Sequence, residues 1–355
     1  MSELTLKSSK PSSTVSGSWL TAAVLSAAAF YTATRLASRV WRKPVNLRGK
    51  IALITGGSRG LGLAIAHELG SYGCDLALCA RDANELEEAA TRLRGRGIDT
   101  QTFPCDITKP AEVSGLVQRV VERFGRLDIL VNNAGLINVA PLDNIERSDF
   151  DAAMDLMFWA PVNLTFAVLP LMRKQAGGGH IVNITSVGGR VAVPHLLPYC
   201  CAKFALTGFS TGLSTELNPE HVHVLTVVPG LMRTGSYLNV PFKGQPEKEF
   251  AWFGLIGNLP GFSVSGEYAA KSIREALQRR QMTCTISLPA KLLIQAEALL
   301  PEVTRTVMQV TNEFVLPRPS STVRKESGKD LNRGFSGLFH ALTALGQMAA
   351  RRWNQ

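Results

Sequence analysis

The feature that most constrains the fold is a glycine-rich stretch between an apolar run and a helical run. Residues 51–54 read Ile-Ala-Leu-Ile, which is typical of a strand buried on both faces of a parallel sheet. Residues 55–62 read Thr-Gly-Gly-Ser-Arg-Gly-Leu-Gly, and residues 63–72 have a helical pattern. Glycines here let the backbone turn tightly and approach a pyrophosphate, which the helix N-terminus then stabilises. This order predicts a nucleotide site, with a ligand-free glycine turn as the alternative.

The alternation of strand and helix continues along the chain. We predict further strands at 75–80, 100–104, 129–131, 181–184, 222–228 and 283–287, the last at a sheet edge, and helices at 84–94, 110–124 and 267–280. A chain of 355 residues has room for such a domain of roughly 250 residues and for two additional ends. The pattern predicts a doubly wound α/β fold of seven parallel strands, with helices on both faces and the site at the carboxyl ends of the strands.

The end of the second predicted strand indicates which nucleotide is bound. A site that prefers NAD usually offers a carboxylate to the ribose hydroxyls at this point, whereas this chain has Ala80 followed by Arg81. Arg59 and Arg81 can both reach toward a 2′-phosphate, so the sequence favours NADP over NAD. The alternative is that Arg81 is only a solvated charge. Asp106, after the third strand, can meet the adenine amino group.

Tyr199 and Lys203 stand four residues apart in a predicted helix, so they share one face. A free phenol has a pKa near 10, so proton exchange near pH 7 needs a shift of roughly 3 units, or about 4 kcal/mol. One cation at about 4 Å in partly screened surroundings supplies about that much. The spacing alone occurs often by chance, so its significance depends on the residues around it.

The order and spacing of these motifs resemble the single-domain branch of the short-chain dehydrogenase/reductase superfamily over residues 50–287. The matching residues are Thr55, Gly56, Gly57, Gly60, Gly62, Asp106, Asn132, Asn133, Ala134, Gly135, Ser186, Tyr199, Lys203, Pro229, Gly230 and Thr234. The resemblance implies an NADP-dependent oxidoreductase that interconverts a carbonyl and a secondary alcohol. The alternative is a non-catalytic nucleotide-binding member that acts as a sensor or scaffold.

The resemblance also implies roles for individual residues. Ser186 would hydrogen-bond the substrate carbonyl, Tyr199 would exchange the proton, and Lys203 would lower the pKa of Tyr199 and hold the nicotinamide ribose. The expected coenzyme ligands are Thr55, Gly56, Ser58, Arg59, Gly60, Leu61, Gly62, Arg81, Asp106, Ile107, Asn133, Ala134, Gly135, Tyr199, Lys203, Pro229, Gly230 and Thr234, the last for the carboxamide. We expect no metal site.

One position departs from the family pattern. The family usually has an asparagine that holds a water in a proton relay from the lysine, and here that position is Met157. A thioether cannot donate to such a relay. The relay is therefore either rebuilt from another group or slower, and Met157 is the one feature that favours the non-catalytic alternative.

The segment after Gly230 is expected to shape the substrate cleft. Residues 231–262 are loop-rich with several large apolar side chains, which predicts a lid over an apolar steroid-, retinoid- or acyl-like substrate. The alternative is a loop that packs on its own domain. His195 precedes Tyr199 on a loop over the cleft, where it either touches substrate or is only a loop residue.

We expect four parts along the chain. They are a tail with a possible membrane anchor (1–49), the catalytic domain (50–289), an apolar helical extension (290–316), and a polar mobile linker followed by an amphipathic helix (317–355). The helical extension offers a surface for a second subunit, the lid or a membrane. The terminal amphipathic helix would dock on the protein or lie on a membrane.

The N-terminal region suggests attachment to a membrane. Residues 11–34 carry no charge, and a helix over 17–37 would be about 30 Å long, enough to span a bilayer. Arg35, Arg39, Arg42 and Lys43 follow, so the catalytic domain would face the cytoplasm, where six cysteines stay reduced. An interfacial helix, a cleaved signal peptide and a plain cytoplasmic protein are the alternatives. The net charge of +10 is spread out, and we find no nucleic-acid motif.

Overall fold

The computed structural model describes residues 26, 30, 34, 43–217, 221–321 and 325–355. Residues Val45–Gln355 form one compact unit, and the segment Met1–Pro44 is a separate unit. The predicted N-terminal helix over 17–37 lies, apart from three isolated positions, outside the described residues.

The centre of the compact unit is one parallel sheet of seven strands, as predicted. Its spatial order is β10-β6-β5-β4-β1-β2-β3. The strands are β1 (Ile51–Thr55), β2 (Asp75–Ala80), β3 (Thr100–Pro104), β4 (Ile129–Asn132), β5 (Gly179–Ile184), β6 (Val222–Pro229) and β10 (Thr283–Ile286). The chain order reverses between β1 and β4, and ligands of open α/β sheets bind in the crevice at such a point.

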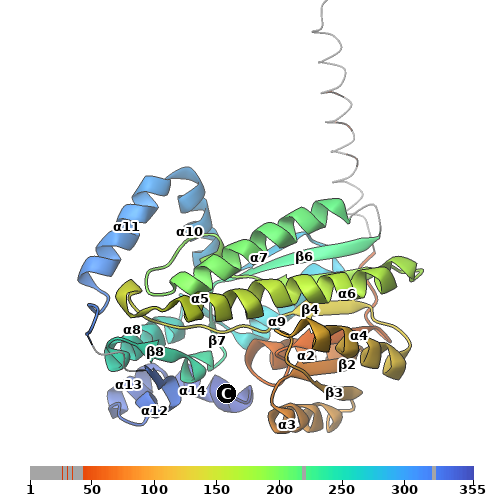
Figure 1. The fold of residues 1–355 in the computed structure, drawn as a ribbon, viewed down its shortest axis with the longest axis horizontal. Helices are drawn as coiled ribbons and strands as arrows, with labels where there is room; N and C mark the ends of the chain where they lie inside the picture. The colour runs from red at the N-terminus through yellow and green to blue at the C-terminus, as the bar shows by residue number, and fades with distance from the viewer. Residues whose placement is uncertain (1–25, 27–29, 31–33, 35–42, 218–220, 322–324) are drawn as a thin grey trace, which may run out of the picture. The chain divides into compact units, whose positions relative to one another are not determined.

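Helices cover both faces of the sheet (Figure 1). Successive residues of β2 alternate between the two cores: Leu76 and Leu78 pack on one side, Ala77 and Cys79 on the other. One face carries α2 (Gly60–Ser71), α3 (Ala83–Arg94) and α9 (Gly266–Gln278). The other carries α4 (Pro110–Phe124), α7 (Leu197–Glu216) and the run α5 (Arg147–Met154), η2 (Asp155–Trp159) and α6 (Ala160–Lys174). Burial on both faces explains the continuous apolar strands.

The run from α5 to α6 is also the one described helix that is long and apolar enough to cross a membrane. It spans Arg147–Lys174, and half of its apolar window is buried inside the protein. Because it packs on the sheet beside α4 and α7, it is a core helix of the α/β domain.

A second, smaller assembly sits over the carboxyl ends of the strands. It combines two distant segments: β7 (Leu231–Arg233), η5 (Ser236–Asn239), β8 (Pro241–Lys243), α8 (Pro246–Asn258) and β9 (Ser263–Ser265) from the first, and β11 (Lys325–Ser327), α12 (Gly328–Asn332), α13 (Gly337–Leu342) and α14 (Ala344–Arg352) from the second. Strand β11 pairs antiparallel with β8, and α12, α13 and α14 pack on α8. We call these two segments together the cap.

The cap differs from the prediction in three ways. The predicted loop-rich lid contains the 13-residue helix α8. Within the predicted linker, strand β11 and helix α12 form instead, because they have β8 and α8 to pair with and pack on. The predicted single terminal helix is two helices, α13 and α14, separated at Thr343.

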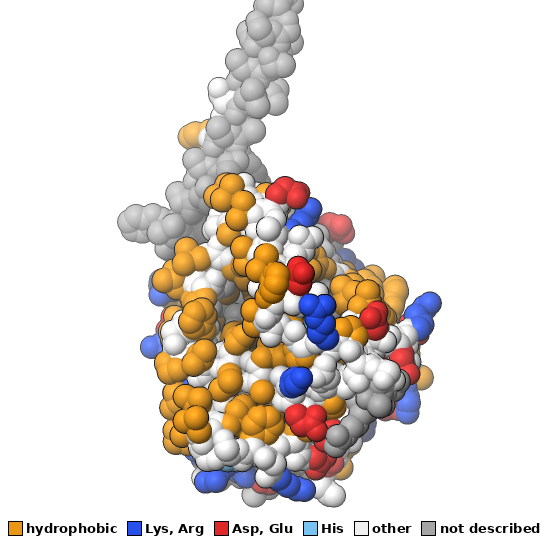
Figure 2. Space-filling model, turned by 90° about the vertical axis from the view of Figure 1, so that its left-hand side faces the viewer, with side chains coloured by type: hydrophobic (Ala, Val, Ile, Leu, Met, Phe, Trp, Pro, Cys, Tyr) orange, Lys and Arg blue, Asp and Glu red, His pale blue; other side chains and the backbone are white. Residues whose placement is uncertain are grey.

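Helices α10 (Leu288–Leu299) and α11 (Pro301–Phe314) form an arm beside the sheet (Figure 1). They match the predicted apolar pair. Exposed hydrophobic side chains of the arm include Leu292, Leu299, Leu300, Val303, Val307, Val310 and Phe314. Figure 2 looks at this side of the molecule and shows hydrophobic side chains spread over much of the face.

Candidate active site

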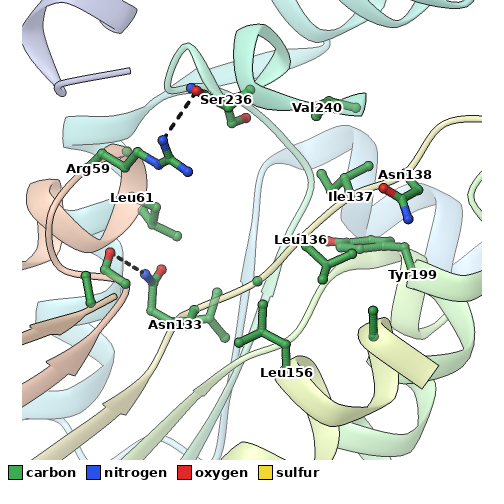
Figure 3. Close-up of a pocket in the computed structure, with 18 of the residues that line it drawn as sticks. Arg59, Leu61, Asn133, Leu136, Ile137, Asn138, Leu156, Tyr199, Ser236 and Val240 are labelled. Carbon is green, nitrogen blue, oxygen red and sulfur yellow. Dashed lines mark hydrogen bonds between the residues drawn. The ribbon is translucent and has the colours of Figure 1, made fainter. Parts of the chain in front are cut away.

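A cavity of about 1170 Å³ lies at the carboxyl ends of the strands, between the glycine-rich turn and the cap. Most of the predicted site residues line it: Gly56, Ser58, Arg59, Gly60, Leu61, Arg81, Asp106, Ile107, Asn133, Ala134, Gly135, Ser186, Tyr199, Lys203, Pro229, Gly230 and Thr234. Thr55 and Gly62 do not. In Figure 3, Arg59, Leu61 and Asn133 face Tyr199, Leu136 and Ile137 across the cavity. Its volume exceeds the about 300–1,000 Å³ that is typical of small-molecule sites.

The glycine-rich turn is compact enough that two of its positions require glycine. Gly56 has a φ of +64°, and a Cβ atom there would lie 3.0 Å from the Cα of Ala134. A Cβ atom at Gly62 would collide with the carbonyl oxygen of Gly56. The turn therefore brings the N-terminus of α2 close to the ends of β1 and β4. Gly62 shapes this turn without lining the cavity.

Thr55 likewise acts from behind the cavity wall. Its Oγ1 accepts hydrogen bonds from the backbone N–H groups of Asn133 (3.0 Å) and Ala134 (3.1 Å). The side-chain amide of Asn133 donates to the carbonyl of Thr55 at 2.9 Å and to that of Gly56 at 3.2 Å. These bonds tie the end of β1 to the end of β4, so Thr55 positions the turn.

Asp106 and Arg81 line the cavity beyond the end of β2. Asp106 Oδ1 accepts bonds from Thr108, from its N–H at 3.1 Å and from its hydroxyl at 2.7 Å. These bonds lower the pKa of the Asp106 carboxyl below its usual value, with smaller contributions from the charges of Arg81 and Lys109. A carboxylate therefore stands where the sequence predicted one.

A second carboxylate in this region was missed. Glu85, in the first turn of α3, accepts a hydrogen bond from Ser58 Oγ at 3.0 Å and pairs with Arg59 at 3.2 Å. The expectation that Arg59 reaches toward a 2′-phosphate did not include a carboxylate that pairs with it. The available signal was the position of Glu85, four residues after Arg81 at the start of a helix, which a parallel α/β fold directs toward the same sheet edge.

The structure brings together Ser186, Tyr199 and Lys203. Ser186 follows β5 and caps η3 (Val187–Gly189), where its Oγ accepts the N–H of Gly188 at 3.0 Å. A Cβ atom at Gly188 would lie 3.2 Å from the ring of Tyr199 and 3.5 Å from Ser186 Oγ, so the missing side chain lets the two approach. The Nζ of Lys203 lies 5.8 Å from the ring centroid of Tyr199 and donates to the carbonyl of Ile184 at 2.7 Å.

Burial controls the protonation of both groups. It raises the pKa of Tyr199 to about 12, with the Ser186 side chain acting in the opposite direction. It lowers the pKa of Lys203 to about 8. In the protein alone, the cost of desolvating the phenolate is the largest influence on the pKa of Tyr199, and the role expected for Lys203 stays a prediction.

Met157 occupies the interior beside this group. It is fully buried in the π-helical turn η2, and its Sδ lies 3.5 Å from where a Cβ atom of Gly135 would stand. Met157 packs with Ala153 and Ala202, and Tyr199 contacts the same cluster. The position is therefore next to the site, as predicted, and the thioether fills it with apolar packing.

The rest of the cavity wall comes from the end of β6 and from the cap. The N–H of Gly230 donates to the carbonyl of Ile286 at 3.1 Å, and Thr234 is buried in the wall. The end of the cavity beyond Tyr199 combines apolar and charged groups. Leu136, Ile137, Leu156, Met232 and Val240 line it, and so does a buried ion pair between Lys243 and Asp149 at 2.7 Å. This ion pair was not predicted, since its partners are 94 residues apart.

His195 does not line this cavity. Its Nδ1 lies 2.9 Å and 3.0 Å from the two carboxylate oxygens of Glu249, which also accepts a bond from Trp252 at 2.6 Å. Glu249 and Trp252 belong to α8, whereas His195 precedes α7 and lines a different cavity, next to α11. His195 therefore holds the cap to the loop before α7.

Comparisons with known proteins agree with this geometry. The sequence model of the family described as short chain dehydrogenase matches residues 50–240. The chain is 36% identical over 245 residues to 11-beta-hydroxysteroid dehydrogenase 1A of Arabidopsis thaliana, covering 68% of this chain and 69% of that protein. It is 30% identical over 299 residues to a fatty acyl-CoA reductase of Acinetobacter baylyi, covering 83% and 95%.

A solved structure shares the fold. A short-chain type dehydrogenase/reductase from Mycobacterium marinum superimposes with a TM-score of 0.59 at 24% identity, over 68% of this chain and 95% of that one. The chain therefore belongs to the short-chain dehydrogenase family. It is an NAD(P)-dependent oxidoreductase that acts on a small molecule.

Proposed function

We propose that this enzyme uses NADP to interconvert a carbonyl and a secondary alcohol on an apolar substrate, with Ser186, Tyr199 and Lys203 as its catalytic residues. The observation that carries the proposal is the meeting of these three side chains in one cavity with the glycine-rich turn. The Ser186 and Tyr199 side chains interact with each other and both line the cavity, so one substrate oxygen can contact both hydroxyls.

The residues around the turn fit a dinucleotide. The close approach at Gly56 and Gly62 leaves no room for a Cβ atom, and the N-terminus of α2 supplies N–H groups to an anion. Gly56 and Leu61 would hold the pyrophosphate, with Gly60 lining the site beside them, and Thr234 with Pro229 would hold the carboxamide end. When bound, the nicotinamide supplies or accepts the hydride.

The protonation states suit Tyr199 as the general acid in the reductive direction. With a pKa raised to about 12, Tyr199 carries its proton at neutral pH and can donate it to the substrate oxygen as that oxygen becomes an alcohol. Ser186 would hold the oxygen by hydrogen bonding. Lys203, whose Nζ is fixed on the carbonyl of Ile184, would hold the nicotinamide ribose and stabilise the tyrosinate left behind.

The preference for NADP is supported by Arg59 and Arg81, which both line the cavity near the end of β2. Glu85 acts against it, because its carboxylate already pairs with Arg59. We expect a 2′-phosphate to displace Glu85 from Arg59, as Arg59 is well exposed and Arg81 adds a second cation. The apolar side chains beyond Tyr199 support a hydrophobic substrate.

The coenzyme assignment is tested by measuring dissociation constants for NADPH and NADH. NADPH should bind at least about tenfold more tightly than NADH, which corresponds to about 1.4 kcal/mol. Arg81→Ala should reduce this ratio, whereas Arg96→Ala, which lies after the end of α3 and does not line the cavity, should not. Equal constants in the wild type would contradict the preference. Turnover with steroid, retinoid, acyl and quinone carbonyls then tests the substrate class.

We also propose that residues 17–37 anchor the enzyme in a membrane with the catalytic domain in the cytoplasm. The support is the uncharged run at 11–34 and the basic residues after it. Full-length protein should stay in the membrane fraction through high-salt and carbonate washing. Release by salt alone would indicate an interfacial helix, and a soluble full-length protein would refute the anchor. We propose in addition a homodimer, for which the apolar arm α10–α11 is a suitable surface.

A further inference from the structure

The segment after α14 lies directly against the glycine-rich turn. The N–H of Gly60, at the start of α2, donates to the carbonyl of Trp353 at 2.8 Å. The side-chain amide of Asn354 donates to the carbonyl of Ser58 at 3.4 Å. In Figure 1 the mark C stands between α14 and α2. Residues almost 300 positions apart in sequence therefore share one backbone contact at the coenzyme turn.

This segment is fixed by packing. Trp353 is 5% exposed and belongs to the core formed by α2, α3 and α9. Gly266, at the start of α9, makes room for it, because a Cβ atom there would lie 3.1 Å from the indole Nε1. Arg352 pairs with Glu267 at 2.9 Å. Trp353 thus determines where the two residues after it can lie.

The side chain of Gln355 reaches the cavity through a chain of hydrogen bonds. Its Oε1 accepts from the amide of Asn239 at 2.5 Å, and Asn239 Oδ1 accepts from Arg59 at 3.3 Å. Gln355 lines the cavity, and its Nε2 lies where a Cβ atom of Gly60 would stand. Among the described residues, no acceptor is hydrogen-bonded to this Nε2.

The arrangement leaves the site open. Trp353 takes only the N–H of Gly60, and the next N–H groups of α2, on Leu61 and Gly62, have no intrahelical partner so near the helix start. The cavity retains its about 1170 Å³ with Gln355 as part of its wall. The segment therefore lines the phosphate site without filling it.

We propose that Trp353, Asn354 and Gln355 are part of the coenzyme site: they hold the glycine-rich turn in place, and the Gln355 amide donates to the coenzyme phosphates. The proposal rests on the coenzyme site proposed above. The ligand chemistry is the pyrophosphate that NADPH and NADH share, since Gln355 stands at Gly60 and contacts Arg59 only through Asn239.

The test is the dissociation constant of each coenzyme for Gln355→Ala, measured by nicotinamide fluorescence. Both NADPH and NADH should bind about tenfold more weakly, because a hydrogen bond to a charged group is lost, and their ratio should stay as in the wild type. Asn239→Ala should weaken binding of both by a smaller factor. The double variant should be no weaker than Gln355→Ala alone, because both substitutions act on one hydrogen-bond chain.

Controls separate this proposal from the one it rests on. Met348→Ala, on the exposed face of α14, should leave both constants unchanged, and thermal unfolding of each variant should match the wild type. Unchanged or tighter binding by a folded Gln355→Ala would overturn the proposal, the tighter result showing that the segment competes with the coenzyme. If the wild type shows no preference for NADPH over NADH, the roles proposed for Arg59 and Arg81 are contradicted. The comparison of Gln355→Ala with the wild type still tests the role of Gln355. A wild type that binds neither coenzyme would overturn both proposals.

Discussion

The two ends of the central cavity are built in different ways. At the nucleotide end, the turn and the neighbouring strand ends are held by short hydrogen bonds such as those from Asn133 and Ala134 to Thr55. At the substrate end, the wall is held by aromatic packing around Phe250, whose ring lies 5.5 Å from Phe242 and 5.4 Å from Phe339. Phe339 comes from a segment that follows the arm. The geometry of the nucleotide end depends on where the parallel strands stop. The geometry of the substrate end depends on contacts between segments that are distant in sequence.

From this difference we infer which region of the molecule tolerates changes in sequence. The nucleotide end leaves little freedom, because glycines and backbone groups must keep their geometry for α2 to begin where it does. The cap has an aromatic cluster of its own around Phe250, so we expect side chains of that cluster to change with less effect on the sheet. We expect substitutions in the two regions to affect different measurements.

The largest effect should come from Tyr199→Phe, at the boundary between the two ends. The ring keeps its packing but cannot donate a proton, so kcat should fall by roughly 10²–10⁴-fold, the range for loss of a general acid. The dissociation constant of NADPH should change by less than about twofold, or about 0.4 kcal/mol. Single-turnover kinetics and coenzyme titration measure the two. Turnover comparable to the wild type would refute the role assigned to Tyr199.

Phe250→Ala should lower the free energy of unfolding without affecting the nucleotide end. Phe250 is fully buried in the cap, so its truncation should lower the free energy of unfolding by about 3–5 kcal/mol. Phe262→Ala, at an exposed position, should cost less than about 1 kcal/mol. Denaturant unfolding gives both values. Folded Phe250→Ala should still bind NADPH, and loss of that binding would show that the two ends are not separable.

Lys203→Met should stabilise the protein while it abolishes turnover. Burial lowers the pKa of Lys203 to about 8 from the 10.5 of an exposed lysine. The folded state therefore binds this proton less tightly than the unfolded state. The resulting destabilisation is fully present below pH 8 and disappears as the pH rises toward 10.5.

Removing the buried charge should raise the free energy of unfolding at pH 7 by about 2–3 kcal/mol, once the lost hydrogen bond to Ile184 is deducted. The gain over the wild type should shrink between pH 8 and 10.5. Unfolding of both proteins across this range is the measurement, with Lys271→Met on the exposed side of α9 as control. A gain that does not depend on pH would contradict the assignment of the effect to the buried charge.

The smallest effect should come from Glu85→Gln, which acts on the nucleotide end alone. Without the carboxylate, Arg59 is available to a 2′-phosphate, so NADPH should bind roughly fivefold more tightly, about 1 kcal/mol, as for other exposed ion pairs. NADH should be unaffected. Glu88→Gln, on the same helix and paired with Arg92, is the matched control. Equal tightening of both coenzymes would show that Glu85 does not act on the 2′-phosphate.

Local sequence patterns were enough to predict the sheet, the glycine-rich turn and the shared face of Tyr199 and Lys203, whereas the place of Ser186 beside them came from the resemblance to the family. The first three follow from local rules: apolar runs form the strands, glycine is required where a Cβ atom does not fit, and a helix brings residues four apart onto one face. Each of these signals is contained in a short stretch of chain, so no knowledge of distant contacts was needed.

Other features could be seen only in the three-dimensional structure. They are the cap, the Lys243–Asp149 ion pair, the pairing of Glu85 with Arg59, and the contact of Gln355 with the turn. Residues 317–333 have a polar sequence typical of a linker, yet strand β11 and helix α12 form there because β8 and α8 supply partners. The same dependence on tertiary packing explains the shifted pKa values of Tyr199 and Lys203. Their spacing is local, but their protonation follows from burial, which depends on everything that packs around them.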